Sequence, residues 1–115
     1  MSEILFGELD PLVYQMTTGF AGGVGSTHAE LCGALAAGVL IIGARCGRTE
    51  GQVDDARCQA LTARFRAQFE ARFGATQCAA LRSLGYGADG TTPCRVLVGQ
   101  ATSLLLELLA GEEPA

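Results

Sequence analysis

The chain contains no lysine, no tryptophan and no asparagine, and it has a single histidine. Its positive charge comes from eight arginines, and its formal net charge is −4. No basic stripe is present to contact phosphates, so a nucleic-acid-binding role is not expected. The absence of asparagine removes one orienting residue of a cysteine-hydrolase triad, and nothing else marks such a triad. No residue is therefore assigned a catalytic role.

The sequence also lacks an apolar run long enough to cross a membrane. The longest run, 34–44, falls well short of the ~20 residues that a membrane span needs, and it is expected to form a buried central helix. The first residues carry neither the basic region nor the apolar run of a signal peptide. We therefore expect a cytoplasmic protein without a transmembrane segment, in which the cysteines stay reduced.

Hydrophobic residues are abundant and charged residues are scarce. They make up 49% and 17% of the 115 residues, a length that suits one domain with a modest core. Such an apolar composition leaves apolar surface exposed on a domain of this size. We expect a single domain over residues 1–115 that binds a protein partner or forms a homo-oligomer.

The apolar residues recur at helical spacing, and no segment alternates apolar and polar residues as a strand would. The sequence predicts an all-α bundle of four to five helices. Phe65, Phe69 and Phe73 form one apolar column and are expected in the core. The segment 19–27 is a predicted Gly-rich loop, and 111–115 is a predicted flexible tail. The expected helices span 10–18, then from a capping box at 27–30 to about 45, 52–73, 76–84 and 92–109.

Three of the five cysteines stand at expected helix starts: Cys32, Cys78 and Cys94. A helix N-terminus carries unpaired N–H groups and about half a positive charge, which favour a thiolate. The thiolate is the form that attacks, oxidises or binds metal. The shared position therefore indicates redox or metal chemistry, although buried cysteines also simply fill space. Cys46 and Cys58 are expected to be structural.

His28 precedes Cys32 by four residues, so the two share one helix face if that turn is helical. Three cysteines and one histidine make a ligand set for zinc or for an iron–sulfur cluster. His28 is a candidate fourth ligand, with a capping or surface role as the alternative. The Gly-rich loop has no P-loop sequence, but a backbone nest at Gly22, Gly23 and Gly25 is a candidate cofactor-binding or anion-binding site.

Four segments follow one another in a fixed order: Gly19 to Gly25, Cys32-Gly33-Ala34, Phe69 to Leu81, and Cys94 with Val98 and Ala101 behind it. In this order they resemble the C_GCAxxG_C_C family of small helical redox-active proteins, over about residues 19–110. The resemblance implies that Cys32, Cys78 and Cys94 are the last three of the family's four cysteines. Related domains, such as that of split-Soret cytochromes, imply that such cysteines can hold an iron–sulfur cluster.

Two departures from the family pattern affect this site. No cysteine precedes Cys32, so the family's first cysteine has no counterpart. The glycine of the family's Cys-Gly-Ala-x-x-Gly motif falls at Ala37, with Gly38 one residue on. A four-cysteine site is therefore not completed as in the family. The fourth ligand stays open among His28, Cys46, Cys58, a partner chain and none.

These observations together predict a redox-active protein, working in electron transfer or thiol redox, with an iron–sulfur cluster on Cys32, Cys78 and Cys94. The missing first cysteine and the leucine-rich segment 104–109 motivate an alternative, a cofactor-free interaction subunit of a larger assembly or a homodimer. A structural Cys3His zinc site is a third interpretation.

Overall fold

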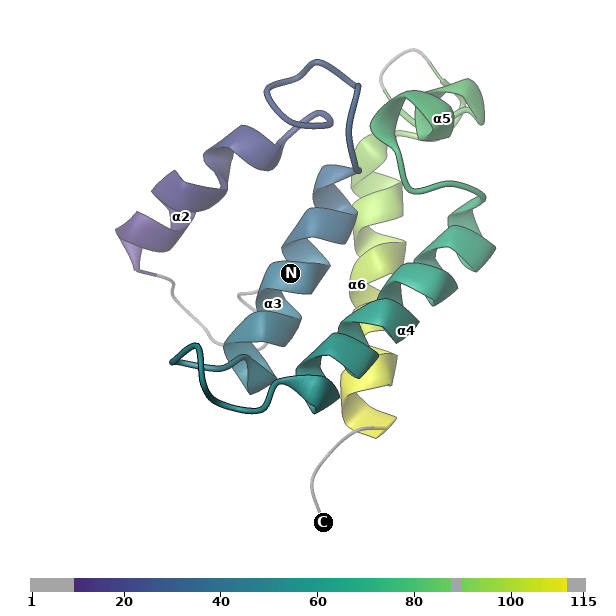
Figure 1. Cartoon of the computed structure of the whole chain (residues 1–115). Coiled ribbons are helices and arrows are strands. Elements are labelled where there is room, and N and C mark those ends of the chain that lie inside the picture. Colours follow the sequence, from purple (N-terminus) through teal and green to yellow (C-terminus); the bar gives the residue numbers. More distant parts are fainter. Residues whose placement is uncertain (1–9, 88–89, 112–115) are drawn as a thin grey trace.

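The computed structural model describes residues 10–87 and 90–111, and this part of the chain is helical with no strand, as predicted (Figure 1). The only β-type backbone pairing among the described residues consists of two isolated bridges, between Leu31 and Gln77 and between Tyr86 and Thr92. The predicted tail lies outside the described residues except for Gly111. The elements are α2 (Pro11–Thr17), the 3-10 helix η1 (Thr18–Phe20), α3 (Gly33–Cys46), α4 (Ala56–Phe73), α5 (Cys78–Ser83) and α6 (Cys94–Gly111).

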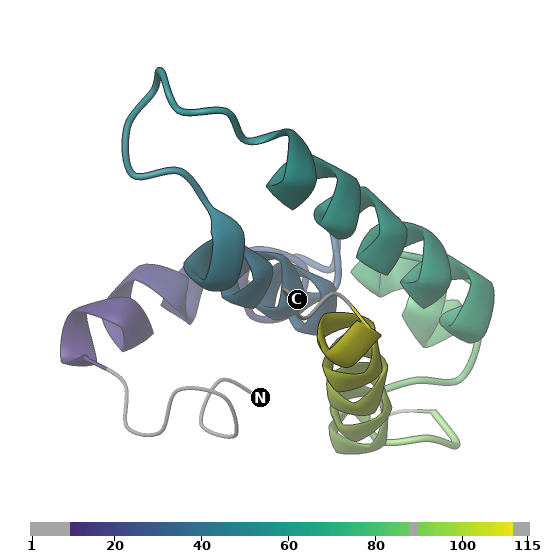
Figure 2. The same ribbon diagram turned by 90° about the horizontal axis from the view of Figure 1, so that it is seen from below.

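The core lies between α3, α4 and α6, each of which packs against the other two (Figures 1 and 2). The predicted phenylalanine column of α4 is buried in it. The rings of Phe65 and Phe69 meet edge to face at 6.2 Å between centroids, and those of Phe69 and Phe73 lie 4.6 Å apart. Aromatic rings bury large areas and prefer such tilted contacts, so this column anchors the bundle. The largest fully buried side chains are Phe65, Phe69, Ile42 and Leu105.

The apolar segment 34–44 lies within α3, and most of it is buried, as expected. A second apolar helix, α6, is by length and composition alone long and apolar enough to cross a membrane, which α3 is not. The core helix of a bundle passes the same test, and Leu97, Leu105 and Leu108 of α6 are buried against the other helices.

The predicted start of the second helix is wrong, because α3 begins at Gly33 and not at the expected capping box. Val24, Ser26 and His28 have φ of 68°, 58° and 61°, and a right-handed helix cannot contain such left-handed residues. The Thr27 hydroxyl caps no helix and donates to the carbonyl of Gly23 at 2.9 Å. The Gly-rich loop therefore extends to the residue before α3.

The start of α4 also differs from the prediction, which placed it at residue 52. Asp55 is the N-cap residue of α4, and the carboxylate of Asp54 before it accepts a hydrogen bond from the N–H of Ala56, the first helical residue, at 2.9 Å. The predicted stop at Gly74 is confirmed. Gly74 has φ of 93°, the left-handed conformation that commonly ends a helix, and its N–H donates to Glu70 O.

Gly38 allows α3 and α4 to approach closely. A Cβ placed on Gly38 would overlap the ring of Phe65 on α4. Gly43 lies on the same helix, but a Cβ there would have no atom within 4 Å. The two glycines therefore separate the effect of packing from that of helix propensity.

We predict that Gly38→Ala destabilises the fold by about 1–3 kcal/mol, because a methyl group would force Phe65 out of its place. Gly43→Ala should instead stabilise it by up to about 1 kcal/mol, since alanine is the better helix former. Urea unfolding followed by helical circular dichroism measures both. Equal changes in the free energy of unfolding for the two substitutions would contradict the close approach of α3 and α4 at Gly38.

Candidate functional site

The Gly-rich loop pairs with the segment that connects α4 to α5. The β-bridge between Leu31 and Gln77 lies at the centre of this contact, which fixes Cys32 beside Cys78. Backbone hydrogen bonds across this contact also satisfy the first two N–H groups of α5, for which the helix itself has no carbonyl partner. Three backbone hydrogen bonds join the segments: Cys32 N to Thr76 O at 2.8 Å, Cys78 N to Glu30 O at 2.9 Å, and Ala79 N to His28 O at 2.9 Å.

Gly23 lets this loop lie directly on Cys78. Its φ is 71°, and a Cβ there would come within 2.6 Å of the Cys78 Cβ and 2.9 Å of the His28 Cα. A side chain at this position would therefore push the loop away from α5. Gly25 has a similar φ of 63°, but a Cβ there would meet nothing within 4 Å.

A second junction joins the end of α5 to the start of α6. The N–H of Gly87 donates to Thr92 O at 2.8 Å, and the N–H of Thr92 donates to Gly85 O at 2.9 Å. Tyr86, between the two glycines, packs its ring edge to face on Phe73 with 6.1 Å between centroids. This junction ties the turn after α5 to the core and brings Cys94, the first residue of α6, to the same end of the bundle as Cys32 and Cys78.

The three cysteines line one pocket of about 380 Å³. Cys32 caps the start of α3, while Cys78 and Cys94 are the first residues of α5 and α6, so their predicted place at helix starts is confirmed. Cys32 and Cys78 are half-buried and Cys94 is exposed, which leaves the pocket open to solvent on the side of Cys94. The rest of the lining is mostly apolar and comes from the end of α2, η1, the Gly-rich loop, α3, α5, the turn after α5, and α6. It includes Phe20, Ala34, Ala37, Leu40, Leu81, Leu97 and Val98.

The expected preference for a thiolate is not met at Cys32. Burial raises the pKa of its thiol above the ordinary value, since a buried thiolate loses its hydration. The N–H groups of Ala34 and Leu35 at the start of α3 lower the pKa, and negative charge on Cys78 and Cys94 raises it again. Burial outweighs the helix N-terminus, so Cys32 stays a thiol at neutral pH.

The other predicted site residues lie differently. Gly22 lines the pocket, whereas Gly23, Gly25 and His28 do not. The N–H of Gly25 donates to Gly19 O at 2.8 Å, so it is not available to a bound anion. His28 is not helical, so it does not share a helix face with Cys32 as the spacing predicted.

Three polar side chains of the pocket, Thr17, Arg82 and Tyr86, were not predicted from the sequence. Arg82 on α5 and Tyr86 both line it. Tyr86 lies in a glycine-rich turn, a common position for a ligand-contacting aromatic residue, but nothing local places it beside the cysteines. Arg82 is four residues after Cys78 on the same helix, a spacing that puts both on one face and is the one available signal.

One family model matches most of the chain. Residues 2–108 match the family described as Putative redox-active protein (C_GCAxxG_C_C). The chain belongs to this family. The resemblance found in the sequence is thereby confirmed, and the family description assigns the chain a redox-active role. No curated protein and no solved structure matches the chain.

We predict that Gly23→Ala exposes Cys78 to alkylation, because the added methyl group must displace either the loop or Cys78. Gly25→Ala is the matched control: both substitutions strain a left-handed backbone by about 1–2 kcal/mol, but only the first meets Cys78. Iodoacetamide labelling followed by mass spectrometry of the Cys78 peptide compares them. Equal labelling in the two variants would show that Gly23 does not shield this thiol.

Proposed function

We propose that the pocket of Cys32, Cys78 and Cys94 is a redox centre that holds an iron–sulfur cluster and that the protein works in electron transfer. The observation that carries the proposal is the convergence of three helix starts, each with a cysteine, on one mostly apolar pocket of about 380 Å³. An iron–sulfur cluster is held by cysteine thiolates, and it takes up and releases single electrons when bound.

The donor set argues for a cluster over a single ion. A single zinc ion requires its ligands to converge on one point, with sulfur at about 2.3 Å. Among residues 10–87 and 90–111, no group of three His, Cys, Asp or Glu side chains is arranged to hold one metal ion. The cysteines of a cluster bind different iron atoms, so they do not need to converge on one point. This arrangement gives no support to a Cys3His zinc site.

The environment of Cys32 also favours a ligand over a nucleophile. Its raised pKa keeps it protonated at neutral pH, and a protonated thiol attacks slowly. Metal binding displaces the proton of a thiol, so a raised pKa does not prevent ligation. The N-termini of α3 and α6 carry partial positive charge toward the pocket and would stabilise an anionic cluster.

The fold narrows the choice of a fourth ligand. Cys32 and Cys46 stand at opposite ends of α3, about 20 Å apart at 1.5 Å per residue. Cys58 lies beside Cys46 and is equally remote. His28 does not line the pocket. Three thiols of this chain would therefore hold the cluster, and a partner chain or a non-protein ligand would complete it.

We predict that protein purified without oxygen contains iron and acid-labile sulfide, with an absorption band near about 400 nm. Serine at position 32, 78 or 94 should remove most of the iron and the band, because each substitution deletes one of three ligands. The measurements are elemental analysis for iron, sulfide and zinc, together with the visible spectrum.

Cys46→Ser is the matched control, since it deletes a half-buried cysteine outside the pocket and should leave iron and absorption unchanged. If the protein is free of metal and two of the three pocket cysteines form a disulfide, thiol redox replaces the cluster as the proposed chemistry. Zinc in place of iron would overturn the electron-transfer role.

A second candidate function is association with another copy of this chain, and the surface of α2 favours it. The helix has no buried residue and no charged residue, and Leu12, Tyr14 and Met16 are 58%, 50% and 71% exposed. Uncharged apolar surfaces associate without like-charge repulsion. Phe20, Leu40 and Val98 line the pocket and are themselves exposed, so a second copy seated there would shield the cysteines from water.

We predict that the protein is a dimer in solution and that Met16→Glu makes it monomeric, because the new carboxylate would have to be buried without a partner. Gln100→Glu adds the same charge at an exposed position of α6 and should leave the dimer intact. Analytical ultracentrifugation distinguishes the two states. A monomeric unmodified protein would refute self-association.

A further inference from the structure

The two cysteines that the redox pocket does not use lie together at the opposite end of α3. Cys46 is the last residue of α3, and Cys58 is the third residue of α4. Both are half-buried, and both pack against the edge of the hydrophobic core. Since α3 and α4 pack against each other, the turn between them brings the end of one helix next to the start of the other.

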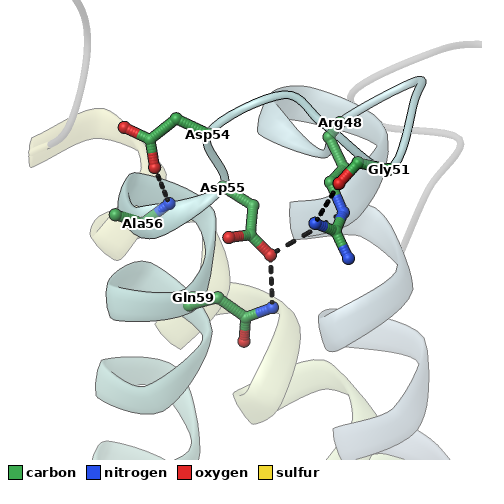
Figure 3. A network of polar contacts seen from close by, with 6 residues as sticks. All are labelled: Arg48, Gly51, Asp54, Asp55, Ala56 and Gln59. Atoms are coloured by element: carbon green, nitrogen blue, oxygen red, sulfur yellow. Dashed lines mark hydrogen bonds and ion pairs between the residues drawn. The ribbon is translucent and has the colours of Figure 1, made fainter.

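A polar network fixes this turn (Figure 3). Arg48 donates to the carbonyl of Gly51 at 3.0 Å and forms an ion pair with Asp55 at 3.9 Å. Asp55 in turn accepts a hydrogen bond from the Gln59 side chain at 3.0 Å. The network therefore links the residues just after α3 to the first turn of α4, and it holds the two cysteine-bearing turns in place.

The side chains of Cys46 and Cys58 share a hydrogen bond. Partial burial and a hydrogen bond between the two side chains raise the pKa of Cys46 to about 11. The S–H of Cys46 is also 3.3 Å from the carbonyl oxygen of Ile42, which accepts it. Arg57 and Arg45 oppose the rise, so two guanidinium groups stand near the pair.

We propose that Cys46 and Cys58 form a reversible disulfide that fastens the end of α3 to the start of α4. The two cysteines stand on helices that pack against each other, the Arg48–Asp55 ion pair spans the turn between these helices, and the two side chains share a hydrogen bond. The oxidant we infer is a small-molecule disulfide, because thiol–disulfide exchange supplies the two-electron oxidation that the new bond requires. Oxidised glutathione has this chemistry and serves as the probe.

The reaction proceeds in two exchange steps. Cys58 attacks first, because Cys46 holds its proton more tightly than an ordinary thiol. Cys58 loses its proton to solvent, its sulfur bonds to one sulfur of the probe, and the S–S bond of the probe breaks to release one glutathione thiolate. That thiolate takes the proton of Cys46, whose sulfur attacks Cys58 and releases the second glutathione, which is protonated by solvent. Two protein thiols lose two electrons in all, and one disulfide is reduced to two thiols.

The disulfide would close a short loop around the turn and limit the freedom of the unfolded chain. We predict that oxidised glutathione raises the midpoint of thermal unfolding by on the order of 10 °C, and that dithiothreitol reverses the change. Cys46→Ser and Cys58→Ser should each abolish the rise. Cys94→Ser removes the exposed cysteine of the pocket and should leave the rise in the unfolding midpoint unchanged.

Peptide mapping identifies the bond itself, on the full chain with free thiols blocked before digestion. Trypsin cuts after arginine, so the linked peptides would be residues 46–48 and 58–64, and each of the five cysteines falls in a different peptide. Finding these two peptides linked supports the proposal. Glutathione attached to Cys58 without the link, disulfides only among the pocket cysteines, or a link that leaves the midpoint unchanged would each overturn it. The iron content of the same sample reports on the pocket separately.

Discussion

The cysteine pocket depends on the backbone hydrogen bonds between residues 28–32 and 76–79. Each of these bonds pairs an N–H of one segment with a carbonyl of the other, and such a bond typically contributes about 0.5–1.5 kcal/mol. The bonds to Cys78 and Ala79 also supply the carbonyl partners that the first turn of α5 lacks. The same contact therefore caps one helix, ends the Gly-rich loop and sets Cys32 beside Cys78. Gly23 is needed because the loop passes too close to Cys78 for any side chain.

Two opposing effects meet at Cys32, and their sizes decide its state. The start of α3 favours a negative sulfur, with a stabilisation that is typically below about 1 kcal/mol at a partly exposed helix end. Removing a charge from water costs more than this, and the pKa of Cys32 is raised accordingly. Position at a helix N-terminus therefore does not by itself make a reactive thiol. In this pocket the burial of Cys32 outweighs the effect of the helix N-terminus on its pKa.

The sequence predicted those features that depend on local residues. The spacing of Phe65, Phe69 and Phe73 was sufficient to predict α4 and its buried face, and Gly74 marked its end. The sequence also predicted that Cys32, Cys78 and Cys94 stand at helix starts, and the family resemblance assigned the three to one site. The membership of the three in one pocket depends on contacts between distant segments, which spacing along the chain does not encode.

The errors have the same origin. The segment 27–30 carries the residues of a capping box, yet its carbonyl groups at His28 and Glu30 accept bonds from α5, and the loop stays left-handed at His28. Nonlocal bonds outweighed the local preference for a helix. The neighbourhood of Cys46 and Cys58 likewise follows from the close approach of α3 and α4 at Gly38. The number of residues between Cys46 and Cys58 in the sequence does not indicate that they are close in space.

The shortness of α5 has a consequence for access to the pocket. A helix that runs only from Cys78 to Ser83 is far below the length at which an isolated helix persists in water, so α5 exists only while both of its junctions hold. Such a segment opens at a lower free energy than the core helices around it. Cys78 therefore stands on a segment that opens more readily than α3, α4 and α6. Brief local opening would admit solutes to the pocket while α3, α4 and α6 stay folded.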